Sequence, residues 1–267
     1  IDRFFFLYPN PNPKNKDLNK RFYAMPFMEK VIEVLRPKGE IYFATNECFY
    51  KEEAIKFGIN PNLILPLWGW VGGRFSLWST IGFSIALQVG MKNFEDLIKG
   101  GNDMDIHFHE TPIRKNLPIM LALVGIWNIN FECYNSLAIL PYDHRLGRFP
   151  AFIQQLDMES SGKSVSKADN LLDIMTGPVV FGEPGTNSQH AFFQSLHQGT
   201  HTIPADFIII ANAKHQLNEH HQKLISNALA QTRALMYGQT FEESHGENFR
   251  TFRGGRPTNT LLIRDLS

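Results

Sequence analysis

The sequence predicts an α/β protein in which strands and helices alternate and the strands form mostly parallel sheets. Short apolar runs of strand length, such as 203–211, lack polar alternation, which is typical of strands buried on both faces. Between such runs apolar residues recur at helical spacing, as they do over 219–236. Alternation of the two patterns implies a parallel sheet covered by helices on both sides.

Composition narrows the class of protein further. The 267 residues, 30.6 kDa, carry 26 basic and 26 acidic side chains, so the neutral charge favours neither a nucleic acid nor a membrane surface as a partner. Two cysteines, Cys48 and Cys133, predict no disulfide scaffold and fit a reducing cytoplasm. The most apolar run, 117–129, is too short to span a bilayer, and no signal peptide is expected.

The first sixty residues predict one small α/β unit. An aromatic strand is expected over 2–8, followed by a rigid loop held by the prolines of 9–13. Apolar residues at three-to-four spacing predict an amphipathic helix over 21–36. A strand over 40–45 and a helix from 47 to 57 complete the unit.

The remaining residues predict a longer α/β segment. Ser76 is expected to cap a helix over 77–89, and the helix over 116–131 is apolar on nearly every face and is therefore expected inside the domain. Residues 142–153 are expected to lead from a strand into a loop that carries Glu159. The other predicted elements are a helix over 93–109, strands over 137–140, 178–182 and 203–211, a helix carrying His190, and a helix over 219–236.

Three stretches carry candidate chemistry. Glu159 and His190, each near turn-forming glycines, have the composition of an acid/base pair, although spacing alone favours a helix-end or ion-paired carboxylate for Glu159. Arg74 follows Gly72 and Gly73, which let the backbone approach a small ligand and aim the guanidinium at it. A surface cation near a helix start is the other interpretation of Arg74.

Neither a metal nor a nucleotide cofactor is expected. His107 and His109, and His215 with the pair 220–221, have loosely ligand-like spacing, but no Cys or Asp set completes a site. The glycines of 182–185 lack the strand–GxGxxG–helix context of a dinucleotide site.

Three motifs resemble glucose-6-phosphate isomerase in the order of that family. They are WVGGRFSLWS (70–79), DMESSGK (157–163) and FGEPGTNSQHAFFQSLHQGT (181–200), and the resemblance runs from about Leu65 to Ser267. It implies a sugar-isomerase (SIS-like) α/β sandwich over 63–267. One departure is Gly69, where the family usually has a small polar or acidic residue.

The resemblance also implies roles for individual residues. Glu159 would be the base that moves a proton between C1 and C2 of a sugar phosphate, held out of water so that its basicity rises. Gln155 would hold a substrate hydroxyl, Gly73 would let the backbone reach the ligand, and Arg74 would stabilise the enediolate. His190 would open the sugar ring from the neighbouring subunit of a homodimer. The family's phosphate loop and a late Lys and Gln have no counterpart here, so little turnover is expected.

Residues 1–62 resemble the carboxyl-terminal half of a tRNA (guanine-N7)-methyltransferase, a partial Rossmann-like unit. The resemblance rests on FLYPNPNPKNKDLNKRF (6–22) and on 44–47. Asn10 and Asn46 stand where that family has Asp, so a non-catalytic remnant is expected, with tRNA a partner only if the methyltransferase interpretation holds. A catalytically inactive module that binds a sugar phosphate is a third possibility. Four cations of the loop are expected to be solvated: Lys14, Lys16, Lys20 and Arg21.

Overall fold

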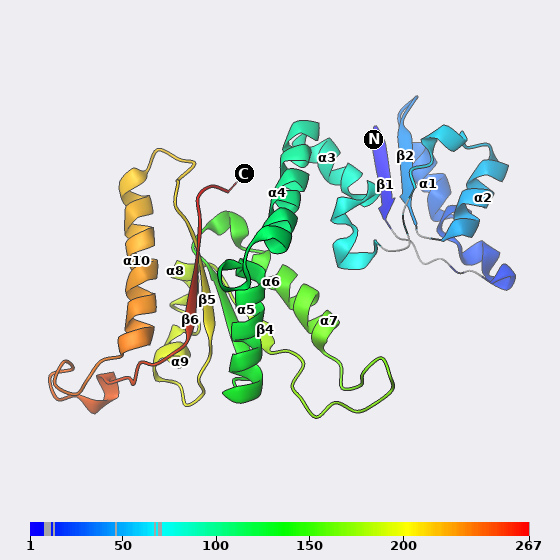
Figure 1. The fold of residues 1–267 in the computed structure, drawn as a ribbon. Coiled ribbons are helices and arrows are strands. Elements are labelled where there is room, and N and C mark those ends of the chain that lie inside the picture. The colour runs from blue at the N-terminus through cyan, green and yellow to red at the C-terminus, as the bar shows by residue number, and fades with distance from the viewer. Residues whose placement is uncertain (8–11, 13, 46, 67, 69–70, 267) are drawn as a thin grey trace. The chain divides into compact units, whose positions relative to one another are not determined.

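The chain folds into two units in the computed structural model (Figure 1). Unit 1 is Ile1–Lys99 and unit 2 is Gly100–Ser267, and each is described by itself below. In the part of the chain that the structure describes, no helix combines the length and apolarity needed to cross a membrane. The described residues are 1–7, 12, 14–45, 47–66, 68 and 71–266.

Unit 1 is organised around two parallel strands. β1 (Arg3–Leu7) pairs with β2 (Glu40–Ala44), with Phe5 opposite Tyr42. Parallel pairing requires a crossover, and α1 (Phe27–Val34) lies in the connection between the strands. α2 (Cys48–Phe57) follows β2. Both predicted strands and the helix after them are confirmed, whereas most of the proline loop lies outside the described residues.

The predicted helix over 21–36 is shorter than expected and faces the core differently. A 3-10 turn over Phe22–Ala24 precedes α1, and Pro26 separates the two. Proline disfavours helical backbone in the residue before it, which explains the break. Val31 is the buried residue of α1, while Ile32, one of the apolar residues at three-to-four spacing that predicted the helix, is 61% exposed. The side of the helix that faces the interior therefore differs by one residue position from the predicted side.

Arg21 lies in the interior of unit 1, which corrects the expectation of a solvated cation. Its guanidinium pairs with Glu53, lies 4.4 Å from the centre of the Phe49 ring, and donates from Nε to the Asn12 carbonyl at 3.1 Å. Hydrogen bonds from Tyr23 and Arg21 lower the pKa of the Glu53 carboxyl. Paired in this way, the charge is tolerated away from water.

The segment after residue 71 begins with 3-10 turns rather than the predicted long helix. The turns span Gly73–Trp78 and Thr80–Gly82, and α3 (Phe83–Val89) follows. Ser76 does not cap a helix, because its hydroxyl donates to the Gly73 carbonyl at 2.6 Å. Ser79 instead caps the 3-10 turn over Thr80–Gly82, because its hydroxyl accepts a hydrogen bond from the amide of residue 81 at 3.3 Å.

Two helical segments follow α3, and the second lies entirely in unit 2. α4 (Met91–Glu110) contains the boundary between the units, and α5 (Leu117–Ile126) runs on into a π-helical turn over Trp127–Phe131. The buried Asn116 caps α5 by accepting from the amide of Ile119 at 3.3 Å. The prediction that 116–131 lies inside is wrong, since its main neighbours are its own flanking turns. Its exposed apolar residues include Leu117, Leu123, Ile126, Trp127 and Phe131.

Unit 2 contains a four-stranded parallel sheet in the order β4-β3-β5-β6 (Figure 1). Its strands are β3 (Ser136–Pro141), β4 (Val179–Phe181), β5 (Ala205–Ile210) and β6 (Thr258–Ile263). The first three confirm the predicted strands, and β6 forms from the apolar run near residue 262. All three pairings are parallel, as the alternation of strands and helices predicted.

Helices cover both faces of this sheet. Phe207 of β5 points into a core that includes residues of α9 (Phe193–Gln198) and α10 (Asn218–Tyr237). Ile208, the next residue, points into a second cluster packed by α6 (Phe149–Ile153). Successive residues of this strand thus pack into the two clusters on opposite faces of the sheet. This arrangement confirms the predicted α/β class and explains why β5 contains an uninterrupted apolar run.

Candidate active site

Glu159 and Gln155 lie on a continuous helical run that follows β3. α6 is followed by a π-helical turn over Gln154–Met158 and then by α7 (Glu159–Ser161). The side-chain amide of Gln154 donates to the Val180 carbonyl at 2.9 Å and fastens the run to β4. The expected loop is thus a helix, in which Gln155 lies within the π turn and Glu159 directly follows it.

Both predicted site residues on this run are exposed to solvent. Glu159 and Gln155 are open to water, and the Glu159 carbonyl accepts from Lys163 Nζ at 2.7 Å. The expectation of a carboxylate held out of water is therefore not met in this chain. α7 has only three residues and its C-cap is Gly162, so this carboxylate lies near the end of the helical run.

His190 lies in the turn between α8 (Gly185–Ser188) and α9 rather than within a helix as predicted. A network inside unit 2 fixes this turn. The Gln189 side-chain amide donates to the Tyr142 hydroxyl at 3.2 Å and also to the Asn227 amide oxygen on α10. Burial raises the pKa of Tyr142 to about 12, although the hydrogen bond from Gln189 opposes that rise. The His190 imidazole itself is exposed.

Close packing fixes the start of the same turn. A Cβ at Gly185 would lie 2.3 Å from the Tyr142 ring, so only glycine fits beside that ring. Ser188 is fully buried, and its hydroxyl donates to the Gly185 carbonyl at 2.7 Å. The backbone that leads to His190 is therefore held rigidly although the imidazole is not covered.

Gly73 and Arg74 belong to unit 1 and lie in the first 3-10 turn after residue 71. Gly73 has a φ of 53°, a left-handed value that favours glycine. Arg74 is half-buried, with its guanidinium carbon 5.6 Å from the centre of the Phe75 ring. Glycine thus permits the left-handed backbone directly before the arginine.

The structure groups the predicted residues only in part. Gln155 and Glu159 share one helical run after β3, and His190 follows β4, the neighbouring strand of the same sheet. Gly73 and Arg74 are described within unit 1 alone. The predicted site residues are therefore divided between unit 1 and unit 2.

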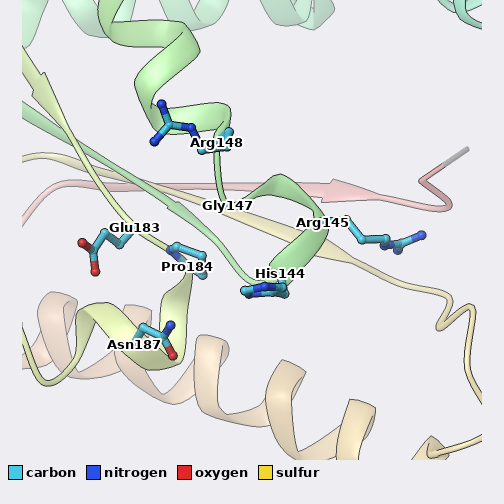
Figure 2. A pocket seen from close by; sticks show the side chains of 7 residues that line it. All are labelled: His144, Arg145, Gly147, Arg148, Glu183, Pro184 and Asn187. Carbon is cyan, nitrogen blue, oxygen red and sulfur yellow. The ribbon is translucent and has the colours of Figure 1, made fainter. Parts of the chain in front are cut away.

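The described part of unit 2 has a hollow of about 420 Å³ beside the ends of β3 and β4, shown in Figure 2. One wall is the turn after β3, and the other is the segment after β4 that leads towards His190. None of the predicted site residues lines it. Its lining residues are His144, Arg145, Gly147, Arg148, Glu183, Pro184 and Asn187.

The Arg145 side chain makes an ion pair and a hydrogen bond with residues that do not line this hollow. Its Nη2 lies 2.7 Å from Asp143 Oδ2, and its Nη1 donates to the Leu266 carbonyl at 3.3 Å. The hydrogen bonds from Arg145 hold the pKa of the Asp143 carboxyl below its usual value. In Figure 2 the Arg145 side chain points away from the other labelled side chains.

A second hollow of about 350 Å³ adjoins the first, since both share His144 and Arg145. It extends to the segment after β5, with Lys214, His215 and His221 among its lining residues. Ligand sites in open α/β sheets lie at the carboxyl ends of the strands, where these segments emerge.

The lining residues after β3 were not singled out from the sequence. His144, Arg145 and Arg148 lie in 142–153, which was interpreted only as a connection. A usable signal was present, because three basic side chains directly follow a strand of a parallel sheet. Glu183 and Asn187 do lie in a motif that the sequence did single out.

Fold and site together define an α/β protein whose candidate catalytic residues follow neighbouring parallel strands. The phosphoglucose isomerase family model matches residues 38–267. This chain therefore belongs to the phosphoglucose isomerase family. The match begins before residue 63, where the sequence had placed the start of the isomerase-like part, and it overlaps a match of residues 1–63 to a putative methyltransferase model.

Two solved structures share the fold. A glucose-6-phosphate isomerase from Chlamydia trachomatis is 28% identical with a TM-score of 0.73, and the match covers 90% of this chain and 53% of that one. A hypothetical protein from Thermus thermophilus is 17% identical with a TM-score of 0.64, covering 97% and 59%, and it supports the fold alone. The chain thus spans about half the length of the solved isomerase that it matches.

Proposed function

We propose that the protein acts in the interconversion of glucose 6-phosphate and fructose 6-phosphate, with the sugar phosphate as substrate and a cis-enediolate as intermediate. The supporting observation is the isomerase family match over 38–267, which includes all the predicted site residues. The likeness to the solved isomerase over 90% of this chain supports the same interpretation.

The proposed base is Glu159, which takes the proton from one carbon of the open sugar and returns it to the neighbouring carbon. A positioned base contributes about a hundred- to ten-thousand-fold in rate. The side-chain amide of Gln155 binds a substrate hydroxyl, and Gly73 lets the backbone reach the sugar. The guanidinium of Arg74 stabilises the negative charge that develops on the enediolate oxygens. The imidazole of His190 opens the ring by moving a proton at the ring oxygen.

Three further parts of the proposal concern assembly, location and activity. The protein forms a homodimer in which His190 serves the site of the partner, and the exposure of its imidazole on a rigid turn is compatible with that role. A location in the cytoplasm accords with the two free cysteines. For a polypeptide limited to these 267 residues, we propose a low turnover.

The test is a coupled assay that detects glucose 6-phosphate formed from fructose 6-phosphate. We expect weak conversion that Glu159→Gln lowers by a further hundredfold or more, about the contribution of a positioned base. Glu219→Gln, on the exposed start of α10, is the matched control and should leave the rate unchanged. Conversion that survives Glu159→Gln would show that this carboxylate is not the base.

The match of residues 1–63 to a putative methyltransferase supports a second candidate function for the start of the chain. We infer a non-catalytic methyltransferase remnant over 1–62 and an isomerase-like domain over 63–267. The positions that carry Asn10 and Asn46 lie outside the described residues. Binding of S-adenosylmethionine or tRNA would favour the methyltransferase interpretation, whereas sugar-phosphate binding without conversion would favour a dead binding module.

A further inference from the structure

The first hollow of unit 2 has the position and size of a small-molecule site. It lies where the segments after β3 and β4 emerge, at the carboxyl ends of neighbouring parallel strands. Its volume of about 420 Å³ falls within the range of roughly 300–1,000 Å³ that is typical of ligand pockets. Because both walls belong to unit 2, the hollow does not depend on how the two units are placed.

Arg148 supplies a positive charge to one wall of the hollow, and His144 supplies an imidazole. Within the described residues, neither side chain makes a hydrogen bond or an ion pair, in contrast to Arg145, which binds Asp143 and the Leu266 carbonyl. A guanidinium offers paired N–H donors whose spacing fits two oxygens of a phosphate. An imidazole adds a further N–H donor.

The opposite wall carries neutral and acidic hydrogen-bonding groups. Glu183 and Asn187 line it from either side of Pro184, and neither side chain has a hydrogen-bond partner in the described parts of the chain (Figure 2). A carboxylate repels a second anion but accepts hydrogen bonds from hydroxyls, and an amide can both donate and accept. The hollow therefore pairs a cationic wall with a wall suited to hydroxyl groups.

We propose that this hollow binds a small phosphorylated polyhydroxy compound. The phosphate lies against Arg148 and His144, and the hydroxyls meet Glu183 and Asn187. The site is separate from the proposed isomerisation residues, because Glu159, Gln155 and His190 do not line it. It therefore stands whether or not the chain catalyses isomerisation.

The first arm of the test uses inorganic phosphate as the probe on the full chain, followed by titration calorimetry. Arg148→Ala should weaken phosphate binding about tenfold or more, the size expected for a lost charged hydrogen-bond pair. Arg148→Lys should recover part of the affinity, since it restores the charge without the paired donors. Arg233→Ala on α10 removes an exposed cation elsewhere in unit 2 and is the matched control.

The second arm separates a phosphorylated sugar or polyol from free phosphate. Glu183→Gln combined with Asn187→Ala should weaken binding of fructose 6-phosphate while leaving inorganic phosphate nearly unaffected. Glu159→Gln should leave phosphate binding unchanged, which distinguishes this hollow from the proposed isomerase site. All five substituted positions are exposed, so circular dichroism should show folded variants.

Three results would overturn the proposal. Phosphate binding that is equal in wild type and Arg148→Ala would place the anion elsewhere, and no binding at millimolar phosphate would remove the site. Equal losses of phosphate and fructose 6-phosphate in the Glu183 and Asn187 variant would reduce it to a simple anion site.

Discussion

Unit 1 and unit 2 use the same parallel β-α-β connection but differ in how completely they bury their sheets. In unit 2 four strands lie between helices on both faces, and Phe207 of β5 is 0% exposed. In unit 1 two strands carry mainly aromatic side chains, and Phe5 and Phe43 remain 38% and 42% exposed. Aromatic composition alone therefore does not make a core, because a two-stranded sheet has no central strand to enclose.

The comparison predicts different sensitivities to loss of a core side chain. The largest effect is expected for Phe207→Ala, which empties the centre of the unit 2 core between Tyr142 and Phe193. We expect a loss of about 3–5 kcal/mol in the free energy of unfolding, measured by urea denaturation followed by circular dichroism. Phe249→Ala, at an exposed position, is the control. A loss below about 1 kcal/mol would show that the unit 2 core is not cooperative.

A smaller effect is expected for Val31→Ala in unit 1. Val31 is the buried residue of α1, and its truncation should cost about 2 kcal/mol. Tryptophan fluorescence is a suitable probe, because Trp68, Trp70 and Trp78 fall within the range of unit 1 and a single tryptophan falls within that of unit 2. Val34→Ala on the exposed side of the same helix is the matched control. Equal losses at the two positions would contradict the observed orientation of α1.

The smallest effect concerns a carboxyl group within the better-buried sheet. Burial raises the pKa of Asp206 on β5 above its ordinary value of 3.8, although a 2.7 Å hydrogen bond from Asn259 opposes the rise. The folded chain thus holds this proton more tightly than the unfolded chain does. Stability from this group is present below pH 3.8 and is lost as the pH rises through the folded-state pKa.

Asp206→Asn should therefore stabilise the protein at pH 7, because no buried charge remains, while Asn259 can still donate to the new amide oxygen. Thermal melts at pH 7 and at pH 3 should show the gain only at the higher pH. Asp105→Asn, on the exposed part of α4, controls for the loss of one charge. A gain of equal size at both values would assign the effect to something other than ionisation.

Much of the fold could be predicted from the sequence where a single pattern decides the structure. Apolar runs located β3 and β5, and helical periodicity located α10, because each element buries a face that its own residues define. The same reasoning failed for 116–131. Its composition is that of a buried helix, but burial depends on a covering surface, which composition does not supply.

The candidate site was less accessible to sequence reasoning than the fold. The motifs identified Glu159 and His190 as candidates, and Gly73, another candidate, adopts a left-handed φ of 53°. Exposure of Glu159 was not foreseen, because it depends on the length of α7 and on what packs against it. The hollow lined by Arg148 was missed for a related reason, since it forms only when two loops distant in sequence emerge beside each other.

The π turn over Gln154–Met158 bears on how catalytic roles are transferred between relatives. A π turn accommodates one residue more than the α-helical turn that it replaces, and each residue advances a helix by about 100°. Consider two chains with the same sequence around Glu159, of which one has the π turn and the other an α-helical turn. The Glu159 carboxylate would then point to different sides of the helix in the two chains. A sequence alignment preserves the order of residues along a chain, whereas a catalytic role depends on the direction in which each side chain points from the helix axis.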